Sequence, residues 1–215
     1  MRIIVLGGPG AGKGTQLLRI SKKLSVVHIS TGDIFRENIS KNTKLGYIAN
    51  EYISKGQLVP DQITCDMVID RIAKEDCKNG YALDGFPRTI VQAKFLDNYL
   101  AERREEIDAI VDIEVNDDII VERLTGRRTC LKCGATYHIK YNKPKVDNVC
   151  DMCGDVLVQR KDDELDTIQN RLKVYHAQTE LLKSYYEETK KFKIVNGDGS
   201  TDEVEKRILS ALEVD

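Results

Sequence analysis

The residues with the clearest chemical potential form a glycine-rich loop near the N-terminus, Gly7-Gly8-Pro9-Gly10-Ala11-Gly12-Lys13-Gly14-Thr15. Consecutive backbone N–H groups in such a loop can turn toward one anion, and the start of the following helix adds the positive end of its dipole. Lys13 supplies a mobile positive charge for the outer phosphates of a nucleotide. The general pattern has Ser or Thr directly after the lysine, whereas here Gly14 stands there and Thr15 follows. The loop therefore predicts a nucleotide phosphate site, and leaves a direct Mg²⁺ bond from a loop hydroxyl in doubt.

Four cysteines have the spacing of a metal site. They form two Cys-x-x-Cys pairs, Cys130 with Cys133 and Cys150 with Cys153, separated by 16 residues. Each pair is followed by glycine, which permits the tight left-handed turn that brings both sulfurs to one metal. Four thiolates would close the coordination shell of Zn²⁺ and make the site structural, and they would suit iron as well. Two disulfides, or a zinc ribbon that binds nucleic acid, are the alternatives.

Arginines are the third group of interest. They stand at Arg36, Arg88, Arg123, Arg127, Arg128, Arg160 and Arg171. Planar bidentate guanidinium groups suit a site where two phosphate-bearing substrates must meet although their charges repel. A phosphate acceptor is already anionic and needs no general base, and no His–Asp pair is placed to act as one. We therefore expect catalysis by positioning and charge stabilisation, as in phosphoryl transfer.

The neighbours of individual arginines add two expectations. Arg123 and Arg127 are spaced by one helical turn and would point the same way. Asp162 and Asp163 follow Arg160 and could fix its guanidinium or make hinge contacts.

The elements that would position these groups alternate along the chain. Short apolar runs predict five strands, at Arg2–Leu6, Val26–Ile29, Tyr81–Asp84, Ala109–Glu114 and Phe192–Val195. Helical patterns separate them, at Gln16–Leu24, from Pro60-Asp61, from Thr89 with Gln92, over 165–186, and from Ser200 with Glu203. The alternation predicts an α/β fold of the P-loop NTPase type, a parallel sheet covered by helices on both faces.

Ligands of such sheets lie beyond the carboxyl ends of the strands. The glycine-rich loop, Thr31-Gly32-Asp33 and Asp84-Gly85-Phe86-Pro87-Arg88 all fall at such ends. Two segments fit no alternation, because 30–59 is helical and polar and 126–163 holds short β-like pieces with the cysteines. We expect both to be insertions on a core made of 1–29, 60–125 and 164–215.

Composition excludes several classes of protein. The chain has 215 residues, 41% hydrophobic and 32% charged, which is typical of a soluble globular protein. Its formal net charge of −2 argues against wholesale nucleic-acid binding, and no stretch is long enough to span a bilayer. The first strand begins directly after Met1 without a signal-peptide pattern, so we expect a cytoplasmic, reducing location. Cys65 and Cys77 are expected to be buried thiols.

Together the motifs resemble the adenylate kinase family over essentially the whole chain. They are GGPGAGKGT at 7–15, STGDIFR at 30–36, LDGFPRT at 83–89 with Gln92, GRR at 126–128, RKDD at 160–163, and Arg171. The chain is similar to the long, bacterial form whose lid carries zinc. The resemblance implies ATP + AMP ⇌ 2 ADP with Mg²⁺, an AMP-binding insertion at 30–59 and a zinc-binding lid at 126–163. It also implies a monomer that maintains the adenine nucleotide balance and closes over its substrates to exclude water.

The resemblance assigns residues to each nucleotide. It places ATP at Gly10, Ala11, Gly12, Lys13, Gly14, Thr15, Arg123, Arg127, Thr136, Tyr137 and Gly199. It places AMP at Thr31, Arg36, Gln57, Leu58, Val59, Gly85, Phe86, Pro87, Arg88, Gln92, Arg160 and Arg171. The catalytic residues would be Lys13, Arg88, Arg123, Arg160 and Arg171. Asp84 would hold Mg²⁺ through its waters, which suits the missing loop hydroxyl.

The sequence leaves alternative roles open for some residues, and alternative functions open for the protein. Gln92 could complete a helix cap and Thr31 could be a helix N-cap. His28, His138 and His176 show no partner pattern and are expected to be structural or exposed. The nearest alternative function is a kinase for UMP, CMP or GMP, although Thr31 and Gln92 favour AMP by resemblance. A nucleotide-binding or zinc-ribbon protein without turnover is the alternative from another class, which the slightly acidic balance disfavours.

Overall fold

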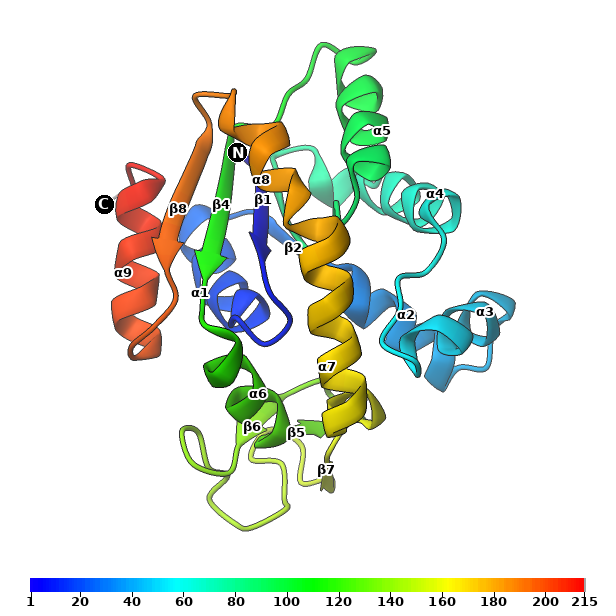
Figure 1. The fold of residues 1–215 in the computed structure, drawn as a ribbon, viewed down its shortest axis with the longest axis vertical. Helices are drawn as coiled ribbons and strands as arrows, with labels where there is room; N and C mark the ends of the chain where they lie inside the picture. The colour runs from blue at the N-terminus through cyan, green and yellow to red at the C-terminus, as the bar shows by residue number, and fades with distance from the viewer. Residues whose placement is uncertain (215) are drawn as a thin grey trace.

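The computed structural model describes residues 1–214, and its centre is a parallel five-stranded sheet in the order β2-β3-β1-β4-β8 (Figure 1). The strands are β1 (Arg2–Gly7), β2 (Val27–Ser30), β3 (Tyr81–Asp84), β4 (Ala109–Glu114) and β8 (Phe192–Asn196). All five predicted strands are confirmed, with no end displaced by more than one residue. β1, for example, is apolar and buried from Ile3 to Leu6 because both of its faces are covered.

Helices cover both faces of the sheet, as predicted. On one face α1 (Lys13–Leu24) and α9 (Thr201–Ala211) bury Leu17, Ile20, Val204 and Ile208 against the strands. On the other face lie α4 (Asp61–Ile72), α5 (Ile90–Ala101) and α8 (Leu181–Glu187), with a 3₁₀ turn at Glu75–Cys77. Cys65 and Cys77 are each 2% exposed within this second core, so the prediction of buried thiols is confirmed.

The helix expected over 165–186 is interrupted. It consists of α7 (Leu165–Val174), one π-helical turn at Tyr175–Thr179, and α8. The α7 half packs Ile168 and Leu172 on α6 (Asp117–Thr125), whereas the α8 half packs on the sheet. The wider π turn rotates the buried face of the helix from α6 to the central sheet. A single helical periodicity over 165–186 cannot predict this change of direction.

The two unusual segments form separate small structures. Helices α2 (Thr31–Ser40) and α3 (Lys44–Ile53) share their own core around Phe35, Ala49 and Val59. A second, antiparallel sheet contains β5 (Arg127–Cys130), β6 (Thr136–His138) and β7 (Leu157–Val158), followed by a 3₁₀ turn at Lys161–Asp163. Figure 1 shows this sheet beyond the carboxyl ends of β1 and β4, and α2 and α3 to one side of the central sheet. Across residues 1–214, every helix is too short or too polar to cross a membrane.

Candidate active site

The glycine-rich loop leaves β1 and leads into α1, as predicted. Lys13 is the first residue of α1, and its Nζ donates to the carbonyl oxygens of Gly7 and Gly8 at 2.7 and 2.8 Å. Burial lowers the pKa of Lys13 to about 8, although the charge of nearby Asp84 opposes the shift. A phosphate group at the loop would favour the charged amine and reverse this effect of burial.

Asp84 stands at the carboxyl end of β3 and faces the same loop. A Cβ on Gly14 would lie 3.1 Å from Asp84 Oδ2, so glycine at the position of the usual loop hydroxyl leaves room for this carboxylate. Burial by itself would raise the pKa of Asp84, but neighbouring His28 and Lys13 hold that pKa below its usual value. The group is therefore an ionised oxygen donor, the kind of ligand that Mg²⁺ or its waters accept.

His28 is a neighbour of this carboxylate that the sequence did not reveal. Its Nε2 lies 3.6 Å from Asp84 Oδ2, a contact longer than a hydrogen bond. The contact exists because β2 pairs with β3 in a register that sets Ser30 opposite Asp84. Strand order decides this pairing, and periodicity along the chain carries no information about strand order.

The turn after β3 folds Arg88 back onto its own backbone. Arg88 Nε donates to the Gly85 carbonyl at 2.9 Å. Gly85 has a φ of 77°, and a Cβ there would lie 2.8 Å from Arg88 Nη2. Only glycine combines that backbone conformation with so close a guanidinium, so the turn fixes where Arg88 points.

Thr31 helps to hold the same turn. Its Oγ1 donates to the Gly85 carbonyl at 3.0 Å, and its side chain is 2% exposed. The alternative that Thr31 caps a helix is wrong, because Ser30 caps α2 by accepting from Asp33 N at 3.2 Å. The Thr31 hydroxyl is thus placed between the first turn of α2 and the arginine turn.

Gln92 is a buried support for Arg88. Thr89 caps α5 by accepting from Gln92 N at 3.2 Å, so this predicted helix start is confirmed. The Gln92 side chain does not complete a capping box, because its Oε1 accepts from Arg88 N at 2.8 Å and its Nε2 donates to Asp61 Oδ1 at 2.8 Å. Its amide thereby links the arginine turn to the start of α4.

The acidic pair after Arg160 fixes other arginines. Arg127 binds Asp163 through two bonds, Nε to Oδ2 at 2.8 Å and Nη2 to Oδ1 at 2.6 Å. Arg171 Nη1 lies 3.1 Å from both Asp163 Oδ1 and Asp162 Oδ2. Arg160 instead donates from Nε to Thr129 Oγ1 at 3.0 Å. The expectation that Asp162 and Asp163 fix Arg160 is wrong, because its side chain extends to β5.

These arginines form one electropositive region with Lys13. Its members are Lys13, Arg36, Arg88, Arg127, Arg160 and Arg171, facing the carboxylates of Asp33, Asp84, Asp112, Asp162 and Asp163. Burial and the charge of Arg171 lower the pKa of Arg88 to about 10, and burial and Arg127 lower that of Arg160 to about 9. Cations exceed carboxylates here, so an additional polyanion would relieve the repulsion.

Arg123 and Arg127 do not lie on one helix. The helix α6 ends at Thr125, and Arg127 begins β5, so the prediction that they point the same way along a helix is wrong. Arg123 Nη2 donates to the Gly197 carbonyl at 3.0 Å and its Nη1 to the Ala11 carbonyl at 3.4 Å. Arg123 therefore joins the phosphate loop to the loop that follows β8.

The end of the 30–59 segment packs against α7. A Cβ on Gly56 would lie 2.8 Å from the Thr167 carbonyl, and Asn170 Nδ2 donates to the Lys55 carbonyl. Of the three predicted contacts that follow, Gln57 is exposed, Leu58 is half-buried and Val59 is 5% exposed. The Val59 side chain belongs to the small core of this segment and leaves only its backbone for a ligand.

The four predicted ligand cysteines converge in the second sheet. The Sγ atoms of Cys130, Cys133, Cys150 and Cys153 all lie within 4.8 Å of one another. Cys130 and Cys153 approach to 3.4 Å, and Cys133 and Cys150 to 3.5 Å, near the ~3.8 Å that a tetrahedral site with Zn–S bonds of about 2.3 Å requires. All six cysteines fall within the described residues and are free, so the disulfide alternative is not the observed arrangement.

Neighbouring residues support this cluster. Gly134 and Gly154 have φ values of 77° and 75°, so the predicted left-handed turns are confirmed. The Tyr137 hydroxyl accepts from Asp151 N at 2.8 Å inside the small core, whereas the Thr136 side chain is exposed. The Tyr137 side chain is therefore occupied inside this small core, and only the Thr136 side chain and the backbone of β6 are open to a ligand.

A phosphate-binding loop at the end of the first strand of a parallel sheet, opposite a surplus of arginines, defines a nucleotide-dependent phosphotransferase. A family model described as "Adenylate kinase" matches residues 5–191. Adenylate kinases of Clostridium perfringens (strain SM101) and Acetivibrio thermocellus are each 54% identical over 212 residues, 99% of this chain and 98% of each relative. The adenylate kinase of Caldanaerobacter subterraneus is 54% identical over 214 residues, 99% of this chain and 96% of that protein. The chain belongs to the adenylate kinase family, whose members exchange a phosphoryl group between ATP and AMP to give two ADP.

Proposed function

We propose that this site performs ATP + AMP ⇌ 2 ADP by positioning and charge stabilisation, without a general base. The observation that supports this is the surplus of cations around Lys13. An AMP phosphate oxygen attacks the γ-phosphorus as the bond from that phosphorus to the bridging β-oxygen breaks, leaving ADP on both sides. The attacking oxygen is already anionic, so the protein's task is alignment and stabilisation of the charge on the transferred group.

We assign ATP to the side of the phosphate loop. Backbone N–H groups of Gly10 to Thr15 would hold the phosphates, and Lys13 would follow the transferred group. Arg123 and Arg127 would clamp the triphosphate. Arg123 already contacts the loop through the Ala11 carbonyl, whereas Arg127 is held by Asp163. The remaining contacts would be with the base, from Thr136, Tyr137 and the backbone of Gly199.

We assign AMP to the side of α2 and the Arg88 turn. Contacts with the nucleoside would come from Thr31, Gln57, Leu58, Val59, Gly85, Phe86, Pro87 and Gln92. Its phosphate would meet Arg36 and Arg88, while Arg160 and Arg171 would bridge toward the transferring group. The bonds of Arg88 support this assignment. Its Nε bond to Gly85 holds the guanidinium ready before substrate arrives, and its backbone N–H bond to Gln92 fixes the turn that carries it.

Mg²⁺ would accompany ATP and be held by Asp84 through its waters. When bound, the ion neutralises phosphate charge. The ionised state of Asp84, and the space that Gly14 leaves for it, support this role. Lys13 and the arginines would position the phosphates and neutralise the remaining phosphate charge.

The cysteine cluster would hold a structural Zn²⁺ that makes 126–163 a rigid lid. We propose that this lid and the AMP-binding insertion 30–59 close over a core of 1–29, 60–125 and 164–215, which excludes water from the transfer. The bond from Arg160 to Thr129 would carry that arginine with the lid. We further propose a cytoplasmic monomer that binds no nucleic acid.

Nucleotide affinity is expected to fall as pH rises through 8. The pKa of Lys13 is about 8 in the free protein, and bound phosphates raise it by favouring the charged amine. Binding then takes up a proton between pH 8 and the raised pKa, and the binding constant falls by at most about tenfold per pH unit there. The measurement is calorimetric titration of Mg·ATP at pH 8.5 in two buffers of different ionisation heat. ATP does not titrate in this range, since its last phosphate pKa is about 6.

Lys13→Arg is the matched control for this proton uptake. Its guanidinium stays charged at pH 8.5, so the variant should bind without taking up a proton at this position. Equal uptake by the two proteins would assign the proton to another group.

The proposed function is tested by incubating the protein with Mg·ATP and AMP, GMP, CMP or UMP, and quantifying the diphosphates formed. We expect rapid ADP formation with AMP alone. Preference for another monophosphate would keep the mechanism and overturn the acceptor site. No transfer to any of them would contradict the proposal.

A further inference from the structure

The loop between β8 and α9, residues 196–199, is fixed at nearly every backbone group. Gly197 N donates to the Glu114 carbonyl at 2.7 Å, and Asp198 N donates to the Asn196 side chain at 2.7 Å. After the loop, Ser200 and Glu203 form a complete capping box at the start of α9. A loop of this kind presents its remaining backbone groups in one geometry.

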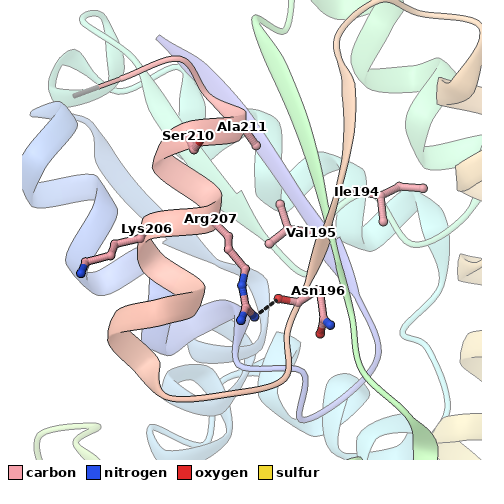
Figure 2. Close-up of a pocket in the computed structure, with 7 residues that line it drawn as sticks. All are labelled: Ile194, Val195, Asn196, Lys206, Arg207, Ser210 and Ala211. Atoms are coloured by element: carbon pink, nitrogen blue, oxygen red, sulfur yellow. Dashed lines mark hydrogen bonds between the residues drawn. The ribbon is translucent and has the colours of Figure 1, made fainter.

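Two arginines hold three consecutive carbonyls of this loop. Arg207 reaches it from α9, where its Nη1 donates to Asn196 O at 2.9 Å and to Asp198 O at 2.5 Å. Figure 2 shows this side chain crossing the groove between α9 and β8 to reach Asn196. Arg123 holds the carbonyl between them, Gly197 O, from α6 at 3.0 Å. Charged donors make stronger bonds to carbonyls than neutral ones do, so these contacts restrain the loop.

Gly199 is the exception in this network. Among residues 1–214 neither its backbone N–H nor its carbonyl has a hydrogen-bond partner. It has a φ of 114°, and a Cβ built on it would lie 2.7 Å from Glu203 Oε2 and 3.6 Å from Arg207 Nη2. The arginine network therefore surrounds the one residue of the loop whose backbone is free to bind something else.

We infer that Arg207 is a positioning residue for the base of the phosphoryl donor, acting through the loop it restrains. The inference rests on the proposed function, in which Gly199 contacts adenine. Adenine offers an amino donor at position 6 where guanine offers a carbonyl acceptor. Arg207 binds the carbonyls of Asn196 and Asp198, and so fixes the loop that carries the free Gly199 carbonyl. The Gly199 carbonyl in that fixed position accepts from the amino group of ATP and opposes the carbonyl of GTP, whereas a loose loop could reorient and serve both.

The test compares Arg207→Gln with Lys206→Gln. Both changes remove one positive charge from exposed positions on α9, but Lys206 points away from the loop and has no partner in the described chain. For each variant, kcat and KM are measured with ATP and with GTP as donor, and KM for AMP is measured at saturating ATP. The fold is checked by circular dichroism and thermal unfolding.

Arg207→Gln is expected to raise KM for ATP about tenfold, the equivalent of losing one or two net hydrogen bonds. The ratio of kcat/KM for ATP to that for GTP should fall by a similar factor, because the loop no longer discriminates. We expect kcat and KM for AMP to stay within about twofold, since the phosphates and the acceptor are untouched. Lys206→Gln should match the wild type, and Arg207→Lys should recover part of the selectivity because it keeps a charged donor.

An unchanged KM for ATP and unchanged ATP/GTP selectivity in Arg207→Gln would overturn the inference. A parallel loss in kcat and in affinity for both nucleotides, with a lower melting temperature, would also overturn it, because a purely structural role predicts that pattern. If Arg207→Gln does not fold, Arg207→Lys replaces it in the test. Reduced ATP/GTP selectivity with normal kcat would support the inference, and wild-type KM and selectivity would overturn it. Failure of the proposed function is distinguishable, because the wild-type protein would then form no ADP from ATP and AMP.

Discussion

Replacing Arg88 with Ala is expected to lower kcat by about 100- to 1,000-fold, the usual cost of removing one preorganised donor from a charged transition state. The Arg88 guanidinium is held by the Gly85 carbonyl and lies in the electropositive region around Lys13. Removing the Arg88 guanidinium takes away positive charge where the two phosphates meet. It also relieves the repulsion between Arg88 and the neighbouring cations in the free protein. The fold should therefore survive while catalysis fails. A coupled assay of ADP formation, with circular dichroism as the check on folding, measures both.

Arg103→Ala is the matched control. Arg103 follows α5, at the opposite end of that helix from Arg88, where it donates to the Tyr99 carbonyl and stacks on the Tyr99 ring. This variant loses the same charge and should keep wild-type turnover. Arg88→Lys should recover only a small part of the activity, because an ammonium cannot make the planar bidentate contact. A near-normal rate for Arg88→Ala would remove Arg88 from the mechanism.

Loss of the metal from the cysteine cluster is expected to lower the melting temperature by about 10 °C or more, chiefly through the lid. The small core of the second sheet consists of Cys130, Tyr137, Cys150 and Leu157. Two of these four residues are proposed ligands, so little apolar packing would be left once the thiolates lost the proposed metal. Cys133→Ser is the sharpest variant, because this proposed ligand is exposed and its replacement costs the least packing. Calorimetry with metal analysis of the same sample measures the effect.

Leu131→Ser controls for changes within the same loop. Leu131 lies between Cys130 and Cys133 and is 74% exposed, so this change should keep the metal and the melting temperature. ATP hydrolysis without AMP should rise in Cys133→Ser if 126–163 acts as the proposed lid, since a disordered lid would no longer exclude water. A Cys133→Ser protein that has lost its metal yet melts like the wild type would show that the cluster stabilises nothing.

Local chemistry was readable from the chain because each signal lies within a short stretch. The phosphate loop, the two Cys-x-x-Cys pairs and the Ser200–Glu203 capping box depend on residues a few positions apart, and all appear in the structure as predicted. The five strands were equally accessible, because strands buried on both faces are apolar runs bounded by glycine or polar residues. The apolar pattern thus determined the class of fold.

Contacts between distant segments were not readable in the same way. Arg127 resembled a helical partner of Arg123, yet it lies on β5 and pairs with Asp163. Asp162 and Asp163 seemed to serve Arg160, their neighbour in sequence, but bind Arg127 and Arg171 instead. His28 meets Asp84, and Arg123 holds the Gly197 carbonyl, only because strands and helices far apart in the chain are adjacent in space.

The sequence by itself therefore determined which chemical groups this protein has and which elements carry them, since propensity, capping and metal-ligand spacing act over a few residues. Only the tertiary structure decided which guanidinium faces which carboxylate and which backbone groups stay free. Those choices depend on strand order, on where α6 ends and on the π turn between α7 and α8. Each is set by packing against segments dozens of residues away, where no local pattern carries the information.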